Sequence, residues 1–514
     1  MCSYRFPLAV VLSLFIPLST SAGAAPASRE VSRTGRVTSG RATAASASGA
    51  SATAGAPTIG DAPATVSPAF TANSLFVTTT DFSSGSATWI DLQSKHATIG
   101  VASIFSDATA RYYNGLIYVV NRLGQDNVQV LDPDAGFSTI RQFSTGNGSN
   151  PHDIVCTGPS TCYVTRYEKA NLWKMDPSNG AVLGTIDLSA LADADGIPEM
   201  DQLALVGNRL FVSVQRLDRN NAFQPTAASY IAVVDISADT LLDANAHVPG
   251  VQPITTTHPD PFSEMQLDGF TGTLYLSETG FFGLLDGGVE AIDPVTLQSL
   301  GTIFTESAAG GDILDVEIVA PDLGYAIIST PQFYTHLISF NPRTGARIAT
   351  VYAPSAYVLQ DVERGPDGLL YLADRTITAP GIRCYNAATG VEITTSPVST
   401  GLPPFDLTFL VPLQTGVVSK TVAPSSIAPN YPNPFNPRTT VPFTLAHAGF
   451  TRVRIFDARG LFVREILAAR LTAGNHRAVW NGTDTAGHAV ASGVYFARLQ
   501  APGFTGVRKM VLLK

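Results

Sequence analysis

Seven acidic residues recur at regular intervals through the middle of the chain. Six of them stand ten or eleven residues before the centre of a short strand-like run, as Asp153 stands before Tyr163. If the repeats surround one axis, the carboxylates converge on it and could bind Ca²⁺ or another divalent cation, or do acid–base chemistry with a raised pKa. The predicted ring consists of Asp107, Asp153, Asp201, Glu264, Asp315, Asp361 and Asp406.

A structural role explains the same recurrence. Every repeat has the same packing problem, whereas a substrate rarely has sevenfold symmetry, so these acids are also expected to bond the backbone of the neighbouring repeat. His152 lies beside Asp153, but adjacent strand residues point to opposite faces and are not expected to share a site. Beyond such a cation the sequence predicts no cofactor, and no catalytic residue is assigned.

The elements that must position these acids are short β-rich runs separated by tight turns. Seven such turns recur between 41 and 59 residues apart. This period and the absence of helical periodicity are typical of propeller blades, each made of four antiparallel strands. The final run, Phe405 to Leu410, is expected to pair beside the strand at Leu75 to Val77 and close the ring. We therefore predict an all-β chain with a seven-bladed β-propeller over residues 71–416. The turns begin at Asp91, Asp132, Asp176, Asp235, Asp293, Asn341 and Asn386.

Charge is distributed unevenly along the chain. Residues 1–70 carry 5 Lys and Arg against 2 Asp and Glu, and residues 421–514 carry 11 against 3. Of the chain's 32 basic and 41 acidic residues, this leaves 16 and 36 for residues 71–420, a net charge of about −20. An acidic body of this kind argues against a nucleic-acid partner.

The N-terminal residues have the composition of export and linker segments. Arg5, the apolar run from Leu8 to Leu18 and the small residues that follow predict a signal peptide over residues 1–24. Residues 25–70 are rich in Ala, Ser, Thr and Gly and predict a flexible leader. No other segment is apolar enough to predict a transmembrane span.

Export also bears on the cysteines. Cys156 and Cys162 flank the segment TGPST on a predicted hairpin, and an exported protein can keep a disulfide there. We therefore predict this pair as a disulfide and Cys384 as a buried thiol.

Several segments carry a family resemblance. NPHDIV, LDPDAG and MDPSNGAVLGTI resemble blades of the YVTN/NHL-type seven-bladed propellers. The resemblance implies the fold more strongly than any function. The body lacks the Trp-Asp dipeptides of WD40 blades, and Trp89 and Trp173 are its only tryptophans, which disfavours a quinone-cofactor dehydrogenase.

The segment YPNPFNP marks the entrance to a second domain, because each proline favours extended backbone in its neighbourhood. Residues 417–430 are predicted as a linker. After the heptad, six runs alternate polar and apolar residues between Gly- and Asp-containing turns, which predicts a small immunoglobulin-like β-sandwich over residues 431–514.

This C-terminal region closely resembles the immunoglobulin-like part of flagellar hook-capping proteins and the type A sorting domains of type IX secretion cargo. The resemblance implies recognition by a secretion machinery, and hence a secreted or cell-surface protein that crosses the periplasm of a Gram-negative-type bacterium. Asn481 departs from the usual Asp of the Trp-Asp-Gly turn. The residues that carry the motif are Tyr431, Pro432, Asn433, Pro434, Phe435, Asn436, Pro437, Gly493, Tyr495 and Lys509.

Two functions are compatible with this organisation. The first is a non-enzymatic binding or scaffold propeller whose loops, including Gln215–Tyr230 and His247–Phe262, hold a protein, peptide or glycan. The alternative is a secreted hydrolase, lyase or lactonase-like enzyme that uses the acidic ring with a bound metal.

Overall fold

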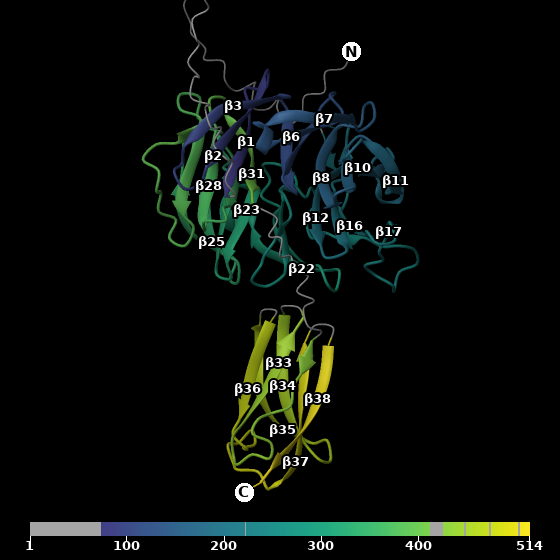
Figure 1. The fold of residues 1–514 in the computed structure, drawn as a ribbon, viewed down its shortest axis with the longest axis vertical. Helices are drawn as coiled ribbons and strands as arrows, with labels where there is room; N and C mark the ends of the chain where they lie inside the picture. The colour runs from purple at the N-terminus through teal and green to yellow at the C-terminus, as the bar shows by residue number, and fades with distance from the viewer. Residues whose placement is uncertain are drawn as a thin grey trace, which may run out of the picture. The chain divides into compact units, whose positions relative to one another are not determined.

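The computed structural model describes residues 73–221, 223–411, 425–446, 449–471, 474–501 and 504–513. The predicted signal peptide (1–24) and leader (25–70), and residues 417–424 of the predicted linker, lie outside these described residues. The described chain forms two all-β parts, a propeller and a C-terminal sandwich (Figure 1). None of the helices in the described ranges has the length and hydropathy needed to cross a membrane.

The first part is a ring of seven antiparallel sheets, which we number as blades from 1 to 7. Blade 1 has the strand order β31-β1-β2-β3 from inside to outside, and blades 2, 3, 5, 6 and 7 each have four strands in chain order. Blade 4 has the order β12-β13-β16-β17, and β18 also pairs with β16.

The innermost strands are β31 (Pro404–Leu410), β4 (Ala108–Tyr113), β8 (Pro151–Gly158), β12 (Met200–Val206), β19 (Gln266–Leu267), β23 (Asp312–Ala320) and β27 (Leu359–Arg364). The second strands are β1 (Ser74–Thr80), β5 (Leu116–Asn121), β9 (Thr161–Arg166), β13 (Arg209–Val214), β20 (Leu274–Glu278), β24 (Leu323–Ser329) and β28 (Leu369–Asp374).

The third strands are β2 (Gly85–Asp91), β6 (Asn127–Asp132), β10 (Asn171–Asp176), β16 (Tyr230–Asp235), β21 (Gly288–Asp293), β25 (Thr335–Asn341) and β29 (Gly381–Asn386). The outer strands are β3 (Ala97–Ile104), β7 (Ser138–Ser144), β11 (Ala181–Asp187), β17 (Thr240–Leu241) with β18 (Ile254–Thr255), β22 (Gln298–Thr305), β26 (Ala346–Tyr352) and β30 (Val398–Ser399). The connections add the hairpin β14 (Leu217–Asp218) and β15 (Gln224–Pro225), and the short helices η1 (Pro133–Ala135), η2 (Ser189–Leu191) and α2 (Glu306–Ala309).

The second strand of each blade is the most deeply buried, because it has a strand on either side and a neighbouring blade on each face. All seven residues of β1 are buried, and so are all five of β20. The apolar core lies between blades: Leu75 and Val77 of blade 1, for example, share a cluster with Tyr371 and Ala373 of blade 7. Burial on both faces explains why these strands have nearly continuous apolar sequences.

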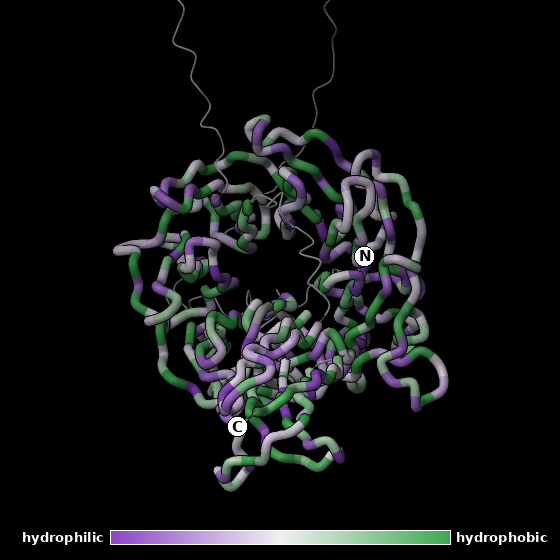
Figure 2. The backbone as a smooth tube through the Cα atoms, turned by 60° about the horizontal axis from the view of Figure 1, so that its bottom comes forward, coloured by the Kyte–Doolittle hydropathy of each residue, from purple (hydrophilic) through white to green (hydrophobic). Residues whose placement is uncertain are grey.

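The ring is closed by strands from opposite ends of the propeller, as the sequence predicts. β31 pairs antiparallel with β1, with Phe409 opposite Leu75 and Leu407 opposite Val77. Figure 2 shows the resulting closed circuit of blades around a central axis. Closure leaves no unpaired strand at the junction.

The turns that punctuate the repeat also form as expected. Asp176 Oδ1 accepts the backbone N–H of Ser178 at 2.8 Å, and Asn341 Oδ1 accepts that of Arg343 at 2.9 Å. Gly180 and Gly345 then adopt positive φ of 76° and 66°. This is the side-chain-capped turn that the Asp/Asn-to-Gly pattern indicates.

The second part is a sandwich of two antiparallel sheets. One sheet has the order β32 (Ser426–Ile427), β33 (Thr439–Leu445) and β36 (Gly474–Trp480). The other has the order β35 (Phe462–Leu471), β34 (Gly449–Asp457), β37 (Gly493–Ala501) and β38 (Phe504–Leu512). Because β32 pairs with β33, the sandwich begins before the residue 431 that the sequence suggests.

The YPNPFNP segment closes one end of this sandwich. Phe435 is 2% exposed and packs on Trp480, with ring centroids 5.5 Å apart. Its backbone N–H donates to Val511 O, and Leu513 N–H donates to its carbonyl, each at 3.0 Å. Trp480 in turn contacts Tyr495 edge to face, while Lys509 is exposed on β38. Several of the predicted motif residues therefore hold the fold together.

The cysteines lie in blades 3 and 7. Cys156 and Cys162 face each other across the β8–β9 hairpin and are joined by a disulfide. Cys384, on β29, is a buried free thiol.

Candidate binding face and central channel

The inner strands are linked to one another by carboxylates. In four places an Asp accepts the backbone N–H of a residue on the inner strand of the next blade, and we call each of these contacts a staple. The staples are Asp153 to Leu203 (2.8 Å), Asp315 to Val362 (2.8 Å), Asp361 to Leu407 (2.8 Å) and Asp406 to Ala110 (3.0 Å). The recurring acids thus satisfy backbone groups that would otherwise be buried without a partner.

The staples also define which residues are equivalent among the blades. In blades 7 and 1 the donating residue directly follows the ring acid of its own strand. In blades 2 and 4 the donors are Ala110 and Leu203, so the equivalent ring positions are Thr109 and Gln202. Glu264 takes the corresponding position in blade 5, two residues before Gln266, which pairs with Tyr275.

Asp107 and Asp201 are therefore out of register with the predicted ring. A bulge or a longer turn adds a residue between the first two strands of blades 3, 6 and 7. Blade 2 has an uninterrupted two-residue hairpin, and in blade 4 the pairing is regular from Leu203 to the two-residue turn, with a register shift before Leu203. In blades 2 and 4, a count of ten or eleven residues back from the centre of the second strand therefore ends before the equivalent ring position. Asp107 instead binds Arg122 Nε at 3.0 Å, and Asp201 binds His152.

One guanidinium connects four blades across the channel. Arg111 follows Thr109 by two residues and so lies on the same strand face. Its Nε and Nη2 bind the two oxygens of Asp153 at 2.8 and 3.0 Å, and Nη1 binds Glu264 Oε1 at 2.5 Å. Nη2 also lies 3.3 Å from Gln202 Oε1. Burial opposes the charge of Arg111, but the Asp153 and Glu264 carboxylates raise its pKa well above the ordinary value.

The negative charges of the acids in blades 6, 7 and 1 are less well balanced by nearby cations. Burial raises the pKa of Asp315 and of Asp406 to about 7. For Asp361 and Glu363, burial and then neighbouring carboxylates raise the pKa well above its usual range. Within the described ranges, no group of three or more His, Cys, Asp or Glu side chains is arranged to hold a metal. Asp315, Asp361 and Asp406 each accept a backbone N–H of the next inner strand, which is the role in staples described above.

A second polar network lies where blades 3 and 4 meet. His152 Nδ1 is 2.7 Å from Asp201 Oδ1, and the imidazole stacks on Tyr167 with ring centroids 4.1 Å apart. The Tyr167 hydroxyl donates to Gln215 Oε1 at 2.9 Å. The carboxylate at Nδ1 and the aromatic ring on its face fix the orientation of the imidazole. His152 is thus paired with Asp201 rather than with its neighbour Asp153.

The connections at one face of the propeller are rich in aromatic residues. We call this the loop face: it comprises the connections that enter each inner strand and those that join the second and third strands. It contains ten aromatic residues, against two, Phe137 and Phe270, in the connections of the opposite face. Its aromatic residues are Phe82, Phe105, Tyr167, Phe223, Phe262, Phe281, Phe282, Phe333, Tyr334 and Tyr357.

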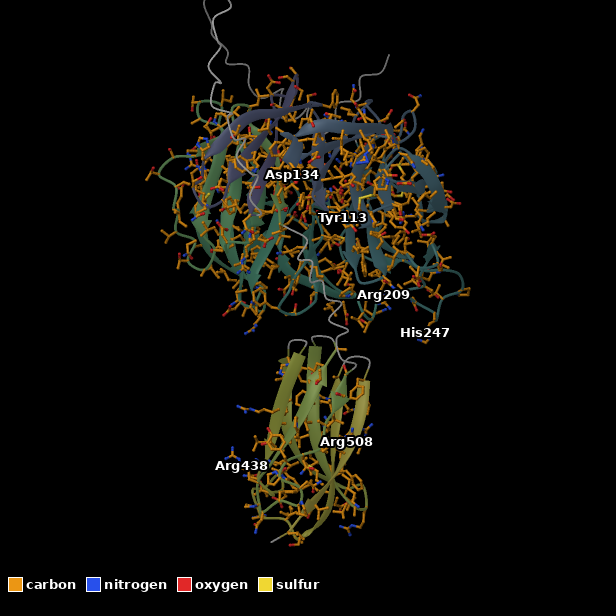
Figure 3. The ribbon with its side chains drawn as sticks, viewed as in Figure 1. Tyr113, Asp134, Arg209, His247, Arg438 and Arg508 are labelled. Carbon is orange, nitrogen blue, oxygen red and sulfur yellow. A yellow bond between two sulfur atoms is a disulfide. The ribbon has the colours of Figure 1, made fainter. Side chains whose placement is uncertain are left out.

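The two predicted insertions lie in different places. Residues 215–229 contain the β14–β15 hairpin and belong to the loop face, where Arg219 binds Glu199 at 2.9 Å and Asp195 at 3.2 Å. Residues 242–253 interrupt the outer strand of blade 4, between β17 and β18, so His247 lies at the rim (Figure 3). Only the final part of the predicted His247–Phe262 loop reaches the loop face.

Sequence comparison identifies the C-terminal part of the chain. Residues 438–502 match the family model described as the FlgD Ig-like domain. The match spans strands of both sheets of the sandwich, from β33 to β37. A comparison with curated proteins finds no match.

Solved structures with a similar fold cover the chain more widely at low identity. PorZ, a bacterial surface component of the type IX secretion system of Porphyromonas gingivalis, is 13% identical with a TM-score of 0.42, and the alignment covers 83% of this chain and 63% of PorZ. A protein from Lactobacillus plantarum is 12% identical with a TM-score of 0.47, covering 66% and 99%. Dihydro-heme d1 dehydrogenase NirN in complex with DHE is 14% identical with a TM-score of 0.42, covering 65% and 75%.

Replacing Arg111 should destabilise the propeller. Arg111→Met leaves the Asp153 carboxylate, whose side chain is 2% exposed, without its cation. We expect a loss of roughly 3 kcal/mol in the free energy of unfolding, measured by urea denaturation. Arg343→Met, at an exposed turn, should cost less than about 0.5 kcal/mol. The double variant Arg111→Met/Asp153→Asn should regain part of the loss, and equal midpoints for Arg111→Met and Arg343→Met would contradict this role.

The raised pKa of Asp315 predicts a pH dependence. Its folded-state pKa of about 7 exceeds that of an unfolded Asp, so its contribution to stability is fully present at low pH and is lost as pH rises through 7. Asp315→Asn should remove this loss while keeping an oxygen for the Val362 N–H. The urea midpoint of wild type relative to Asp315→Asn should therefore fall between pH 4.5 and 7.5. The exposed Asp322→Asn is the control, and parallel profiles for wild type and Asp315→Asn would show the inference wrong.

Proposed function

We propose that this chain is an exported bacterial propeller that acts as a binding or scaffold module at the cell surface or outside the cell. The observation that carries the proposal is the concentration of aromatic residues on the loop face. Four of them are exposed by 38–42%: Phe262, Phe282, Phe333 and Tyr334. Clustered exposed aromatic residues on a rigid scaffold are typical of protein recognition surfaces.

The architecture supports a recognition role in a second way. The staples and the inter-blade core hold the strands, whereas the loop-face connections vary from three residues at 105–107 to fifteen at 215–229. Variable loops on a repetitive scaffold can change without disturbing the packing between blades. The polar network around His152 lies at this face and could orient a bound group.

We propose further that the C-terminal domain directs secretion or attaches the protein to the surface. The proposal rests on the FlgD Ig-like match and on the resemblance of the YPNPFNP segment and the last strands to type A sorting domains. The domain is basic, and Arg438 and Arg508 lie on the sandwich (Figure 3). Exposed cations such as Lys509 are suited to an acidic partner in the secretion machinery.

The sorting role predicts a defect in release. In a bacterium with a type IX secretion system, the full chain should reach the surface or the medium, whereas a chain lacking residues 425–514 should accumulate in the periplasm because it lacks the sorting domain. Cell fractionation measures this. An unchanged urea midpoint for the truncated propeller serves as the folding control, and equal surface delivery of both chains would sink the sorting proposal.

The binding role predicts that the loop face holds the chain on cells. Purified full chain is added to cells lacking their own copy, and the retained fraction is measured. A triple replacement of Phe262, Leu284 and Ile377 by Ser, at positions 38%, 68% and 85% exposed, should lower retention at least about tenfold.

The control replaces three exposed apolar residues of comparable exposure that belong to no loop-face connection. Val182→Ser, Ile348→Ser and Val391→Ser combined, at positions 46%, 56% and 63% exposed, should leave retention within about twofold. Equal losses in the two triple variants would mean that general hydrophobicity, and not the loop face, retains the protein.

A further inference from the structure

An aromatic patch spans blades 5 and 6 on the loop face. We define it by Phe282 and Leu284, between β20 and β21, and by Phe333 and Tyr334, between β24 and β25. The rings of Phe282 and Phe333 are stacked, with centroids 6.2 Å apart and an interplanar angle of 28°. The four side chains are nevertheless 42%, 68%, 40% and 39% exposed, in the same order. The two loops therefore meet through aromatic contact without burying it.

The patch is held in place by hydrogen bonds within and between the blades. Gly283 N–H donates to Asp312 Oδ1 at 2.7 Å, which ties the blade 5 loop to the start of the blade 6 inner strand. Phe281 N–H donates to Asp286 Oδ1 at 2.9 Å. Phe333 N–H donates to Thr330 O at 2.7 Å, with Phe333 at a φ of 58°. A bulky residue at positive φ is uncommon, and here that conformation accompanies an exposed ring.

The surroundings of the patch are acidic. The four loop-face connections of blades 5, 6 and 7 nearest in sequence to the patch, residues 279–287, 306–311, 330–334 and 353–358, contain no Lys or Arg. They contain two acids: Asp286, which is exposed, and Glu306, which is buried and whose pKa burial raises to about 8, so Asp286 supplies the charge beside the patch. Arg347 reaches this region from β26, where its guanidinium donates to Ala309 O and to Thr350 Oγ1. The loop face as a whole carries twelve acids and five bases.

We propose that this patch binds a cationic, extended segment of a partner protein, with Arg or Lys side chains over the Phe282 and Phe333 rings and a further cation beside Asp286. The inference rests on the proposed binding role and names its partner class. A cation within about 6 Å of an aromatic ring gains roughly 0.5–1 kcal/mol at an exposed site, and the negative field of the face adds attraction at a distance. An acidic partner segment would be repelled by the same field.

Fluorescence anisotropy of labelled twelve-residue peptides with the full chain tests the proposal. The cationic probe is a peptide composed of Arg, Lys and Leu. Two matched peptides have the same sequence, with Gln in place of every Arg and Lys in one and Glu in the other. We expect the cationic peptide to bind at least about tenfold more tightly than the Gln peptide, with affinity falling as salt rises. Phe282→Ser/Phe333→Ser should weaken binding about tenfold, and Val182→Ser/Ile348→Ser should not.

Phe282→Trp/Phe333→Trp guards against loss of the loop structure, because it keeps aromatic rings at both positions and should keep binding. Equal binding of the cationic and Gln peptides would overturn the proposal, as would a cationic peptide that binds wild type and the Ser double variant alike. Displacement of the peptide by neutral oligosaccharides would assign the patch to glycans instead. If the peptide fails while the loop-face triple variant still abolishes retention on cells, the partner class is wrong and the binding role stands.

Discussion

A carboxylate that accepts a backbone N–H from the next inner strand is the contact on which the propeller depends. The inner strands surround the axis. Their backbone groups on the axis side have no further strand to pair with, and a side-chain acceptor from the neighbouring blade satisfies some of these groups instead. Asp153, Asp315, Asp361 and Asp406 make this contact at 2.8–3.0 Å. In blade 2 the equivalent ring position is Thr109, whose hydroxyl donates a hydrogen bond to His152 O of blade 3. Blades 2 and 3 are therefore also linked, but here the side chain is the donor and the backbone the acceptor.

These staples place several carboxylates close together around the axis. Their mutual repulsion is reduced in two ways. On one side, Arg111 neutralises Asp153 and Glu264 and joins blades that are not adjacent. On the other, the acids of blades 6, 7 and 1 bind protons more tightly than free carboxyls do, because burial disfavours their charge. Carboxylates of the channel thus link the blades, whereas the exposed aromatic side chains Phe262, Phe282, Phe333 and Tyr334 lie on the loop face.

The sequence predicts the repeat well because each blade repeats the same local requirements. An Asp or Asn such as Asp176 begins a turn in every blade, and the unpaired first and last strands indicate closure. Side-chain register is harder, because a bulge or a turn of different length changes the count, and the predicted ring therefore has Asp107, two residues before Thr109, and Asp201, one residue before Gln202. Arg111 has no counterpart in other blades, so a search for recurring residues passes over it. The pairing of His152 with Asp201 depends on two blades 49 residues apart in sequence and has no local signal.

Because β1 pairs with β31, the ring can close only after the ribosome has synthesised the last strand of the propeller. Pro404, the first residue of β31, follows Ser74, the first residue of β1, by 330 positions. At about 10 residues per second, β1 waits roughly half a minute with an unpaired edge that could join another chain. A chain in this state benefits from a chaperone that holds it until β31 has been synthesised. The sandwich strands from β32 onward emerge only after β31, so a chain folding as it emerges can complete the ring before its C-terminal domain exists.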